Sequence, residues 1–285
     1  MNPRLNVRTI RTRKCRDGAE PLVMVTAYDQ PTAVIASAAG VDLILVGDTV
    51  ADNVLGYEDT LQVTIDDMEH HVAAVARTKP ECLIVGDMPW MSYHVSPEET
   101  VRNAARLIRA GAGCVKLEGG RKRVPAIEAI VNAEIPVMGH VGLTPQSVHS
   151  MGGMRVQGRQ VDTAAALIAD ATAIADAGCF AIVIEAVPDA VGTAVTAAVE
   201  VPTIGIGAGA NCDGQVLVFH DALGLGSRPV AKFVRRYANL AEDATKALAA
   251  FATDVRSGAF PSEKESYESS DELRHALDVD PVPPG

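Results

Sequence analysis

The stretch VDLILVGDTVADNVLGYEDTLQVT, residues 41–64, decides the fold. It opens with an apolar run, residues 41–46, which only Asp42 interrupts, and a glycine flanks the run on each side. A run of this kind is too short for a helix and is typical of a strand that is buried on both faces. Because Asp48 follows directly, we expect a carboxylate at the point where this strand ends.

Four further apolar segments end on an ionisable residue in the same way. The segments are ECLIVGD, GCVKLE, EIPVMGH and CFAIVIE, which end at Asp87, Glu118, His140 and Glu185. Segments with helical periodicity separate them, and such alternation is typical of a parallel sheet. The loops at the carboxyl ends of parallel strands converge on one mouth, so we expect these side chains to lie close together.

The number of strands favours a closed barrel. Seven strands are recognisable up to PTIGI at residues 202–206, and an eighth is expected within residues 216–223. A (βα)8 barrel needs about 250 residues, which the chain of 285 provides. The alternative is an open, doubly wound sheet, but no GxGxxG motif follows the first strand, which weakens the dinucleotide-binding version of that fold.

The chain is expected to form one catalytic domain and a tail. The barrel domain is expected to span residues 1–261, including a basic N-terminal helix that covers one end of the barrel. Residues 262–285 hold seven acidic and two basic side chains and are expected to form a disordered tail. The formal net charge of −11 argues against nonspecific binding of nucleic acid.

Targeting signals and cysteine usage favour a cytoplasmic protein. No apolar run approaches the roughly 20 residues of a membrane span, and the first twenty residues lack the apolar core of a secretory signal. The five cysteines are widely spaced and form no CxxC motif. We therefore expect free thiols in a reducing compartment and no binding to membranes.

Three of the acids are candidates for a metal site. Asp48, Asp87 and Glu118 end the second, third and fourth strands, which are neighbours in a barrel. Each acid taken alone is more simply a helix cap or a solvated charge. Together they would repel one another unless a hard divalent cation with oxygen ligands lay between them, and this favours Mg²⁺.

Two further side chains suggest a substrate anion and a base. Lys116 lies two residues before Glu118, so both side chains point to the barrel interior. A lysine there needs an anion, which is either a substrate carboxylate or Glu118 itself. Glu185 lies across the barrel, where apolar surroundings would raise its pKa and suit a general base. An ordinary salt bridge is the alternative for Glu185. The glycine-rich residues 141–160 are expected to form a functional loop, often a lid.

Six blocks of sequence, in order, closely resemble the ketopantoate hydroxymethyltransferase family. They are VGDTVADNVLGYEDTLQVT, GDMPWMSY, GAGCVKLEGG, GHVGLTPQSVHSMGGMRVQGR, IEAVP and GIGAGANCDGQVLVFHDALGL. The resemblance covers roughly residues 8–262. It implies a (βα)8 barrel of the phosphoenolpyruvate/pyruvate-like superfamily type, dependence on Mg²⁺, and a cytosolic homo-oligomer, often a decamer.

The resemblance also implies an activity. The family transfers a hydroxymethyl group from 5,10-methylenetetrahydrofolate, or a modified pterin, to 3-methyl-2-oxobutanoate. The product is 2-dehydropantoate, and the reaction is the first step toward pantothenate and coenzyme A.

Roles follow by position in the matching blocks. The resemblance implies metal ligation by Asp48, Asp87 and Glu118, and catalysis by Glu185 as the base. The implied ketoacid contacts are Asp48, Thr49, Asp87 and Lys116. His140 and Tyr28 are expected just outside these contacts, where they would hold them in place. The family usually has serine where Thr49 stands; the hydroxyl is kept, but the extra methyl group could crowd the substrate carboxylate.

Two other functions fit parts of the pattern. The first is a Mg²⁺-dependent lyase of the isocitrate lyase and phosphoenolpyruvate mutase type, which also binds ketoacid enolates at strand ends. Such lyases carry a cysteine in a loop like KKCGH, whereas the segment after Glu118, GGRKRVPA, contains no cysteine. The second is a barrel that binds a metabolite without catalysis.

Overall fold

The computed structural model describes residues 5–226 and 230–278. The chain divides into two compact units, residues 1–237 and 238–285. The boundary that we expect at residue 261 is a different division, and it stays a prediction.

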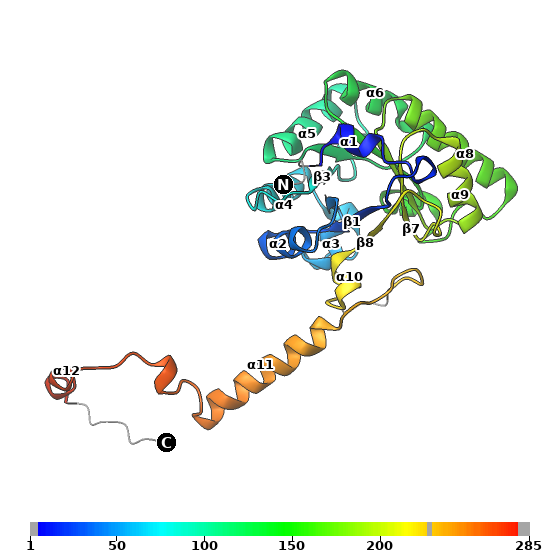
Figure 1. Ribbon diagram of the computed structural model, residues 1–285. Helices are drawn as coiled ribbons and strands as arrows, with labels where there is room; N and C mark the ends of the chain where they lie inside the picture. The colour runs from blue at the N-terminus through cyan, green and yellow to red at the C-terminus, as the bar shows by residue number, and fades with distance from the viewer. Residues whose placement is uncertain (1–4, 227–229, 279–285) are drawn as a thin grey trace. The chain divides into compact units, whose positions relative to one another are not determined.

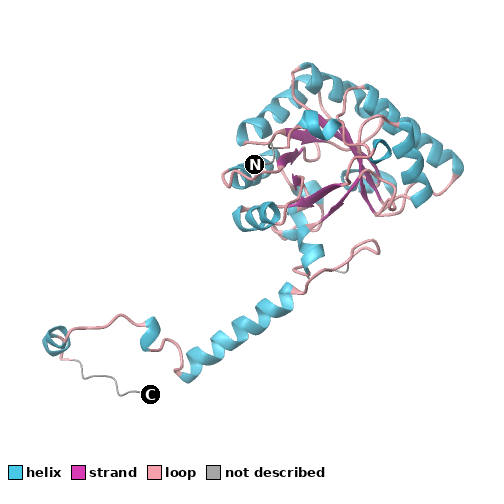
Figure 2. Ribbon diagram, viewed as in Figure 1, coloured by secondary structure: helices cyan, strands magenta, loops and turns pink. Residues whose placement is uncertain are grey.

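Eight parallel strands form a closed barrel in the order β1 to β8 (Figures 1 and 2). The strands are β1 Leu22–Thr26, β2 Leu43–Val46, β3 Leu83–Asp87, β4 Cys114–Lys116, β5 Val137–Gly142, β6 Ala181–Glu185, β7 Thr203–Ile206 and β8 Gly214–Leu217. The closed order confirms the predicted (βα)8 barrel and excludes the open sheet. The eighth strand begins two residues before the expected range 216–223 and overlaps only its first two positions, and most of that range forms the short helix α10, Phe219–Leu223.

Helices surround the strands in the first unit (Figure 1). Their bounds are α1 Val7–Arg11, α2 Gln30–Ala38, α3 Val50–Asn53, α4 Ile65–Ala76, α5 Pro97–Ala110, α6 Val124–Asn132, α7 Val148–Met151, α8 Val161–Asp176 and α9 Asp189–Ala198. Short 3₁₀ helices are η1 Cys15–Asp17, η2 Thr60–Gln62, η3 Arg121–Arg123 and η4 Pro145–Ser147. Helix α5 begins as its sequence predicts: Ser96 accepts a hydrogen bond from the Glu99 N–H, and the helix ends at Gly111 in the left-handed conformation.

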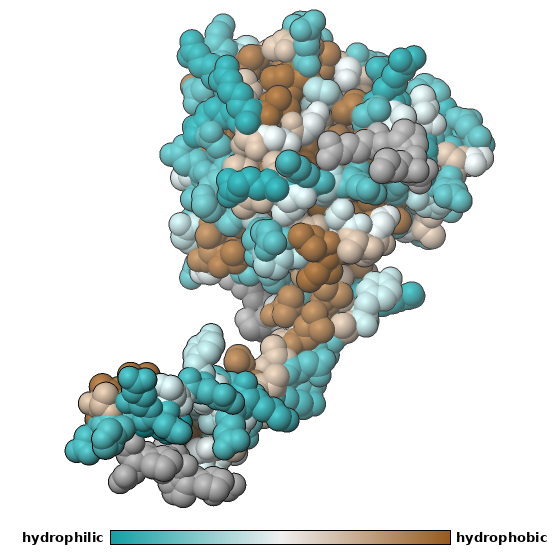
Figure 3. Space-filling model, turned by 60° about the vertical axis from the view of Figure 1, so that its left-hand side comes forward, coloured by the Kyte–Doolittle hydropathy of each residue, from teal (hydrophilic) through white to brown (hydrophobic). Residues whose placement is uncertain are grey.

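The strands divide the apolar core into two layers. Leu43 and Leu45 of β2 belong to the cluster inside the barrel, whereas Ile44 and Val46 pack against the helices. This alternation is the two-residue period of a strand, and it explains why the apolar run of β2 has no polar position. Figure 3 shows that hydrophilic side chains dominate the visible face of the first unit, with smaller hydrophobic patches between them.

The N-terminal segment closes the amino-terminal end of the barrel. Ile10 of α1 is fully buried and belongs to the cluster inside the barrel. Lys14 is 2% exposed, and its Nζ donates to Asp213 Oδ2 at 2.7 Å and to the Thr196 carbonyl at 2.9 Å. Asp213 also accepts hydrogen bonds from the N–H and hydroxyl of Thr203. The buried ion pair therefore joins the first segment of the chain to β7 and β8.

We expect Asp213→Asn to lower the free energy of unfolding by about 3–5 kcal/mol, because it leaves the Lys14 ammonium buried without its counter-charge. Urea denaturation followed by circular dichroism measures this change. The matched control is Glu200→Gln, which breaks an ion pair with Arg16 at the surface and is expected to cost about 0–1 kcal/mol. Equal losses in the two variants would contradict the prediction.

The second unit contains α11 Leu240–Ser257, η5 Glu263–Glu265 and α12 Asp271–Ala276. The spacing of Phe233, Tyr237 and Leu240 in the sequence predicts a closing helix over residues 230–253, but α11 begins ten residues later. Phe233 therefore lies outside the helix, and its ring packs against Gly207 of the barrel unit. Within the described residues, no helix has both the length and the apolar character that a membrane span requires.

Candidate active site

Strand periodicity brings four ionisable side chains into the barrel mouth. Asp87, Lys116, His140 and Glu185 stand two or four residues after interior-facing residues of their own strands, so their side chains point inward as well. Asp87 pairs with Lys116 in the register of β3 and β4, which places the two side chains beside each other. The sequence therefore predicted correctly that these residues lie together.

Asp48 also lies at the barrel mouth, but it belongs to a turn and not to a strand. It follows β2 in a turn after Gly47, and its backbone N–H donates to Asp87 Oδ2 at 3.1 Å. Both carboxyl groups are almost fully buried. Burial, together with the negative charges of Asp87 and Glu118, raises the pKa of Asp48 well above its ordinary value. Asp48 is therefore a carboxyl group whose charge the protein alone does not compensate.

Lys116 pairs with Asp87. Its Nζ lies 2.8 Å from Asp87 Oδ1, so the two buried charges form an ion pair. Burial alone would lower the pKa of Lys116, but the carboxylates Asp87, Glu118 and Asp48 raise it above its ordinary value. The sequence suggested Glu118 as the partner of Lys116 within the protein. The structure shows that Asp87 takes this place.

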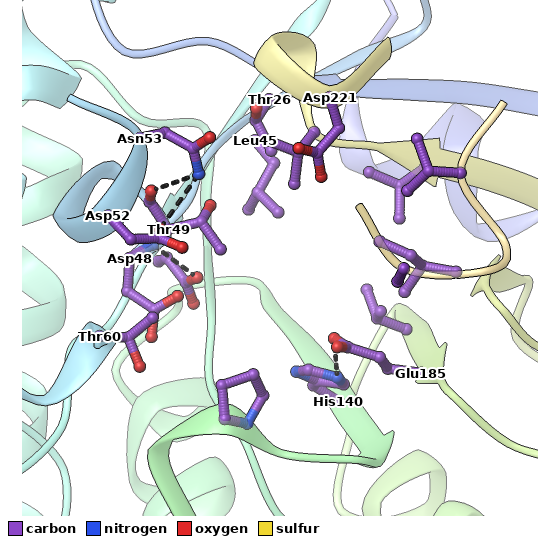
Figure 4. Close-up of a pocket in the computed structure, with 18 of the residues that line it drawn as sticks. Thr26, Leu45, Asp48, Thr49, Asp52, Asn53, Thr60, His140, Glu185 and Asp221 are labelled. Atoms are coloured by element: carbon purple, nitrogen blue, oxygen red, sulfur yellow. Dashed lines mark hydrogen bonds and ion pairs between the residues drawn. The ribbon is translucent and has the colours of Figure 1, made fainter. Parts of the chain in front are cut away.

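His140 connects Glu118 with Glu185. Its Nδ1 lies 3.4 Å from Glu118 Oε1, and its Nε2 lies 3.3 Å from Glu185 Oε2 (Figure 4). Burial and Lys116 lower the pKa of His140, but hydrogen bonding to the two glutamates and the charge of Glu118 raise it to about 9. The same contact with His140 lowers the pKa of Glu118, although burial opposes this. A protonated His140 therefore stabilises two carboxylates at once.

The raised pKa of His140 predicts how stability depends on pH. The folded protein holds the proton more tightly than the unfolded chain, whose histidine has a pKa of about 6.5. The stabilisation is therefore complete below about pH 6.5 and is lost as the pH rises through about 9. Urea denaturation of the EDTA-treated protein should show this decline, and His140→Gln should lack it. An identical decline in the variant would contradict the assignment to His140.

Gln146 also belongs to the site, although no pattern in the sequence indicates it. Its backbone N–H donates to Glu118 Oε2 at 3.0 Å, and its side-chain amide donates to Asp48 Oδ2 at 2.9 Å. The Tyr93 hydroxyl donates to Gln146 Oε1 and accepts from the Glu118 N–H. Gln146 belongs to the segment 141–160, which was expected to act as a loop. That segment contains η4 and α7, and its first part is packed into the site.

Tyr28 lies beside Thr49, one of the residues that are expected to contact the substrate. Its hydroxyl is 2.8 Å from Thr49 Oγ1, and its ring is fully buried. Burial raises the pKa of Tyr28, so the phenol stays protonated and fixes the hydroxyl of Thr49 by a hydrogen bond. This contact orients Thr49 at the rim of the site.

The ionisable side chains of the barrel mouth line one cavity of about 380 Å³ (Figure 4). The polar lining includes Asp48, Asp87, Lys116, Glu118, His140 and Glu185. Apolar residues from several strands line other parts, among them Leu45, Val183, Ile206 and Val216. The cavity falls within the usual size range of small-molecule sites, about 300–1,000 Å³.

The acids are suited to a divalent cation. Asp48 and Asp87 are buried next to each other, and burial together with the neighbouring negative charges raises the pKa of Asp48. Glu118 is instead engaged by Gln146 and His140. In the described part of the chain, no three His, Cys, Asp or Glu side chains have an arrangement that would hold a metal ion. Mg²⁺ commonly uses only one or two protein carboxylates and completes its shell with water and substrate, so the Asp48–Asp87 pair fits it.

Comparison with known proteins identifies close relatives. The pattern of the family described as ketopantoate hydroxymethyltransferase matches residues 4–263. The 3-methyl-2-oxobutanoate hydroxymethyltransferase of Koribacter versatilis is 52% identical over 261 residues, which cover 91% of this chain and 88% of the relative. The protein of the same name from Syntrophomonas wolfei is 48% identical over 96% of this chain and 99% of its own length.

Solved structures with the same fold are more distant. The structure of 2,3-dimethylmalate lyase, a member of the phosphoenolpyruvate mutase/isocitrate lyase superfamily, has a TM-score of 0.59, 16% identity and coverage of 92% of both chains. Phosphonopyruvate hydrolase in complex with oxalate and Mg²⁺ has a TM-score of 0.57 and 14% identity, and covers 96% of this chain and 95% of its own. At these identities the likeness concerns the fold alone.

Proposed function

The chain belongs to the ketopantoate hydroxymethyltransferase family, and from this premise we propose that it transfers a hydroxymethyl group to 3-methyl-2-oxobutanoate. The product would be 2-dehydropantoate, as in the first step toward pantothenate and coenzyme A. The observation that supports this reaction most strongly is that Glu185 lines the same cavity as the buried pair of Asp48 and Asp87. A carbon acid bound between them would meet a base and a cluster of charges at once.

We propose that Mg²⁺ is held directly by Asp48 and Asp87. Glu118, which the sequence predicts as a third ligand, is engaged by Gln146 and His140 and would act from beyond the metal ligands. The support is the raised pKa of Asp48, because a cation beside its buried carboxyl group would stabilise the charged form. When bound, Mg²⁺ would supply positive charge beside the keto oxygen of the substrate and so acidify its C3 proton.

The residues of the chain would bind and orient the ketoacid. The Lys116 ammonium would attract the substrate carboxylate, and the Thr49 hydroxyl, held by Tyr28, would donate a hydrogen bond to it. These contacts fix the orientation of C3 relative to Glu185, and correct positioning of this kind lowers the barrier to reaction. The apolar side chains of Leu45 and Val183 would exclude water from the branched end of the substrate.

Glu185 would remove the C3 proton as the general base. Its side chain is 18% exposed, and His140 holds Oε2 so that one carboxylate oxygen is kept in a defined position. The carbon freed of its proton would then attack the one-carbon unit of the donor. Overall, ketoacid, 5,10-methylenetetrahydrofolate and water would give 2-dehydropantoate and tetrahydrofolate.

Three other properties are proposed with this activity. A catalytic domain that reaches residue 261 is supported by the family match, which ends at residue 263. A cytoplasmic location is supported by the five cysteines, none of which forms a disulfide. Homo-oligomer formation, with a decamer as the expected state, is supported by α11, which carries Leu248, Phe251 and Val255 exposed at helical spacing. Light scattering of the purified protein measures this assembly.

The activity is tested with purified protein, Mg²⁺, 3-methyl-2-oxobutanoate and 5,10-methylenetetrahydrofolate. We expect 2-dehydropantoate to form, and we expect EDTA to abolish its formation. Exchange of the C3 proton with solvent deuterium should occur without the donor. Protein that catalyses neither reaction would overturn the proposal, and cleavage of a methylisocitrate-like acid would favour the lyase instead.

A further inference from the structure

The cavity is larger than the ketoacid requires. The residues that would bind the ketoacid and Mg²⁺ are only part of the cavity lining, and 3-methyl-2-oxobutanoate has only five carbons. A cavity of about 380 Å³ has room for a second, larger molecule next to it. A wall of different character, lined by Ile206, Val218, Asp221 and Phe233, bounds this remaining space.

Phe233 gives this wall a surface for an aromatic ring. A Cβ atom on Gly207 would lie 2.5 Å from Phe233 Cδ1, so the ring occupies space that only a glycine leaves open. Gly207 directly follows Ile206, the residue that pairs with Glu185 between β6 and β7. Phe233 remains 37% exposed and lines the cavity. Its ring therefore lies near the base and can stack on a flat ligand.

Asp221 gives the same wall a charged hydrogen-bond acceptor. It lies on α10, across the cavity from Glu185 (Figure 4). Two bonds fix this helix: the Phe219 N–H donates to Thr26 Oγ1 at 3.0 Å, and the Tyr237 N–H donates to the Ala222 carbonyl at 2.7 Å. The second bond also ties the segment that carries Phe233 to α10. Burial and the nearby charge of Asp52 raise the pKa of Asp221, which a pair of donors from a ligand would counteract.

The charge of Asp221 decides which substrate this wall suits. A carboxylate there would repel the carboxylate of the ketoacid. The pterin ring of a tetrahydrofolate has the opposite character, because its 2-amino group and N3–H form an edge of two donors. A carboxylate can accept both hydrogen bonds in a bidentate arrangement, and the flat ring can stack on an aromatic side chain.

We infer that this wall holds the reduced pterin of the one-carbon donor, with the Asp221 carboxylate on its 2-amino/N3–H edge and the Phe233 ring on its face. This inference rests on the proposed function, because it names the contacts of the donor in that reaction. The pterin would lie between Asp221 and the ketoacid, which places its one-carbon unit toward the carbon that Glu185 deprotonates.

The test separates donor binding from the chemistry at the ketoacid. Asp221→Asn presents an amide N–H to the donor edge, so we expect the dissociation constants of tetrahydrofolate and 6-methyltetrahydropterin to rise about 10- to 100-fold. The KM for the donor should rise in proportion, whereas the KM for 3-methyl-2-oxobutanoate in proton exchange should not. Using both probes assigns the effect to the pterin ring, because 6-methyltetrahydropterin lacks the rest of the folate.

Matched variants make each outcome decisive. Asp162→Asn changes an exposed aspartate of α8 and should bind both probes as the wild type does. Unchanged probe affinity in a folded Asp221→Asn variant overturns the inference, while wild-type transfer and exchange would leave the proposed function intact.

If Asp221→Asn does not fold, Phe233→Leu decides instead: weaker binding of both probes supports the inference, and unchanged binding overturns it. Wild-type protein without exchange or transfer would remove the proposed function itself.

Discussion

Glu185→Gln is expected to slow the exchange of the C3 proton of 3-methyl-2-oxobutanoate by about 10²–10⁴-fold, and product formation with it. Glutamine has nearly the same shape as glutamate but cannot accept the proton. The contacts of Asp48, Asp87 and Lys116 do not involve Glu185, so affinity for Mg²⁺ and for the ketoacid should remain. Deuterium exchange followed by NMR measures the chemical step, and calorimetry measures the two affinities.

A matched control for this variant is Glu128→Gln, on the exposed face of α6. It makes the same chemical change outside the cavity and should leave exchange unaltered. Normal exchange in Glu185→Gln would remove this residue from its role as the base. Loss of ketoacid binding together with exchange would instead indicate that Glu185 acts mainly by holding His140 and the pocket walls.

Asp87→Asn is expected to abolish both Mg²⁺ binding and activity. The change removes a buried negative charge beside Asp48 and also takes away the counter-charge of Lys116. Loss of an outer-sphere partner of a metal already costs about 10- to 100-fold in affinity, and loss of a direct ligand should cost more. Titration with Mn²⁺, followed by electron paramagnetic resonance, measures this affinity without relying on turnover.

Asp162→Asn serves as the control for this substitution too, since it removes a carboxylate from the surface. Asp87→Asn should lose affinity for the metal, whereas Glu185→Gln should keep it. Wild-type affinity for Mn²⁺ in a folded Asp87→Asn protein would refute the assignment of the metal to the Asp48–Asp87 pair.

Strand periodicity explains why much of the site could be predicted from the sequence. Asp87, Lys116 and Glu185 each stand at an even distance from an interior-facing residue of their strand, so their directions follow from the two-residue period. The barrel itself follows from alternating apolar runs and helices. The correct ion-pair partner of Lys116 did not follow, because partners in neighbouring strands depend on register, which spacing along one strand does not contain.

Gln146 and Phe233 show where this reasoning ends. Gln146 lies in a segment without periodicity, and its contacts with Asp48 and Glu118 depend on how the chain folds back after β5. Phe233 stands at helical spacing from Tyr237, and the pattern therefore favoured a helix, whereas a tertiary contact with Gly207 places the ring at the cavity. Site residues in irregular backbone are therefore hard to predict from composition or from the spacing of apolar residues.

The anchoring of Lys14 has a consequence for how the protein is made. Its ammonium binds residues that follow it by 182, 187 and 199 positions, so its partners leave the ribosome long after it does. Until then, the start of the chain has nowhere to dock, and the sheet keeps two open edges. Nascent chains that stall before Asp213 should therefore need chaperones, and completion of the last strand should be the event that makes the product resistant to proteases.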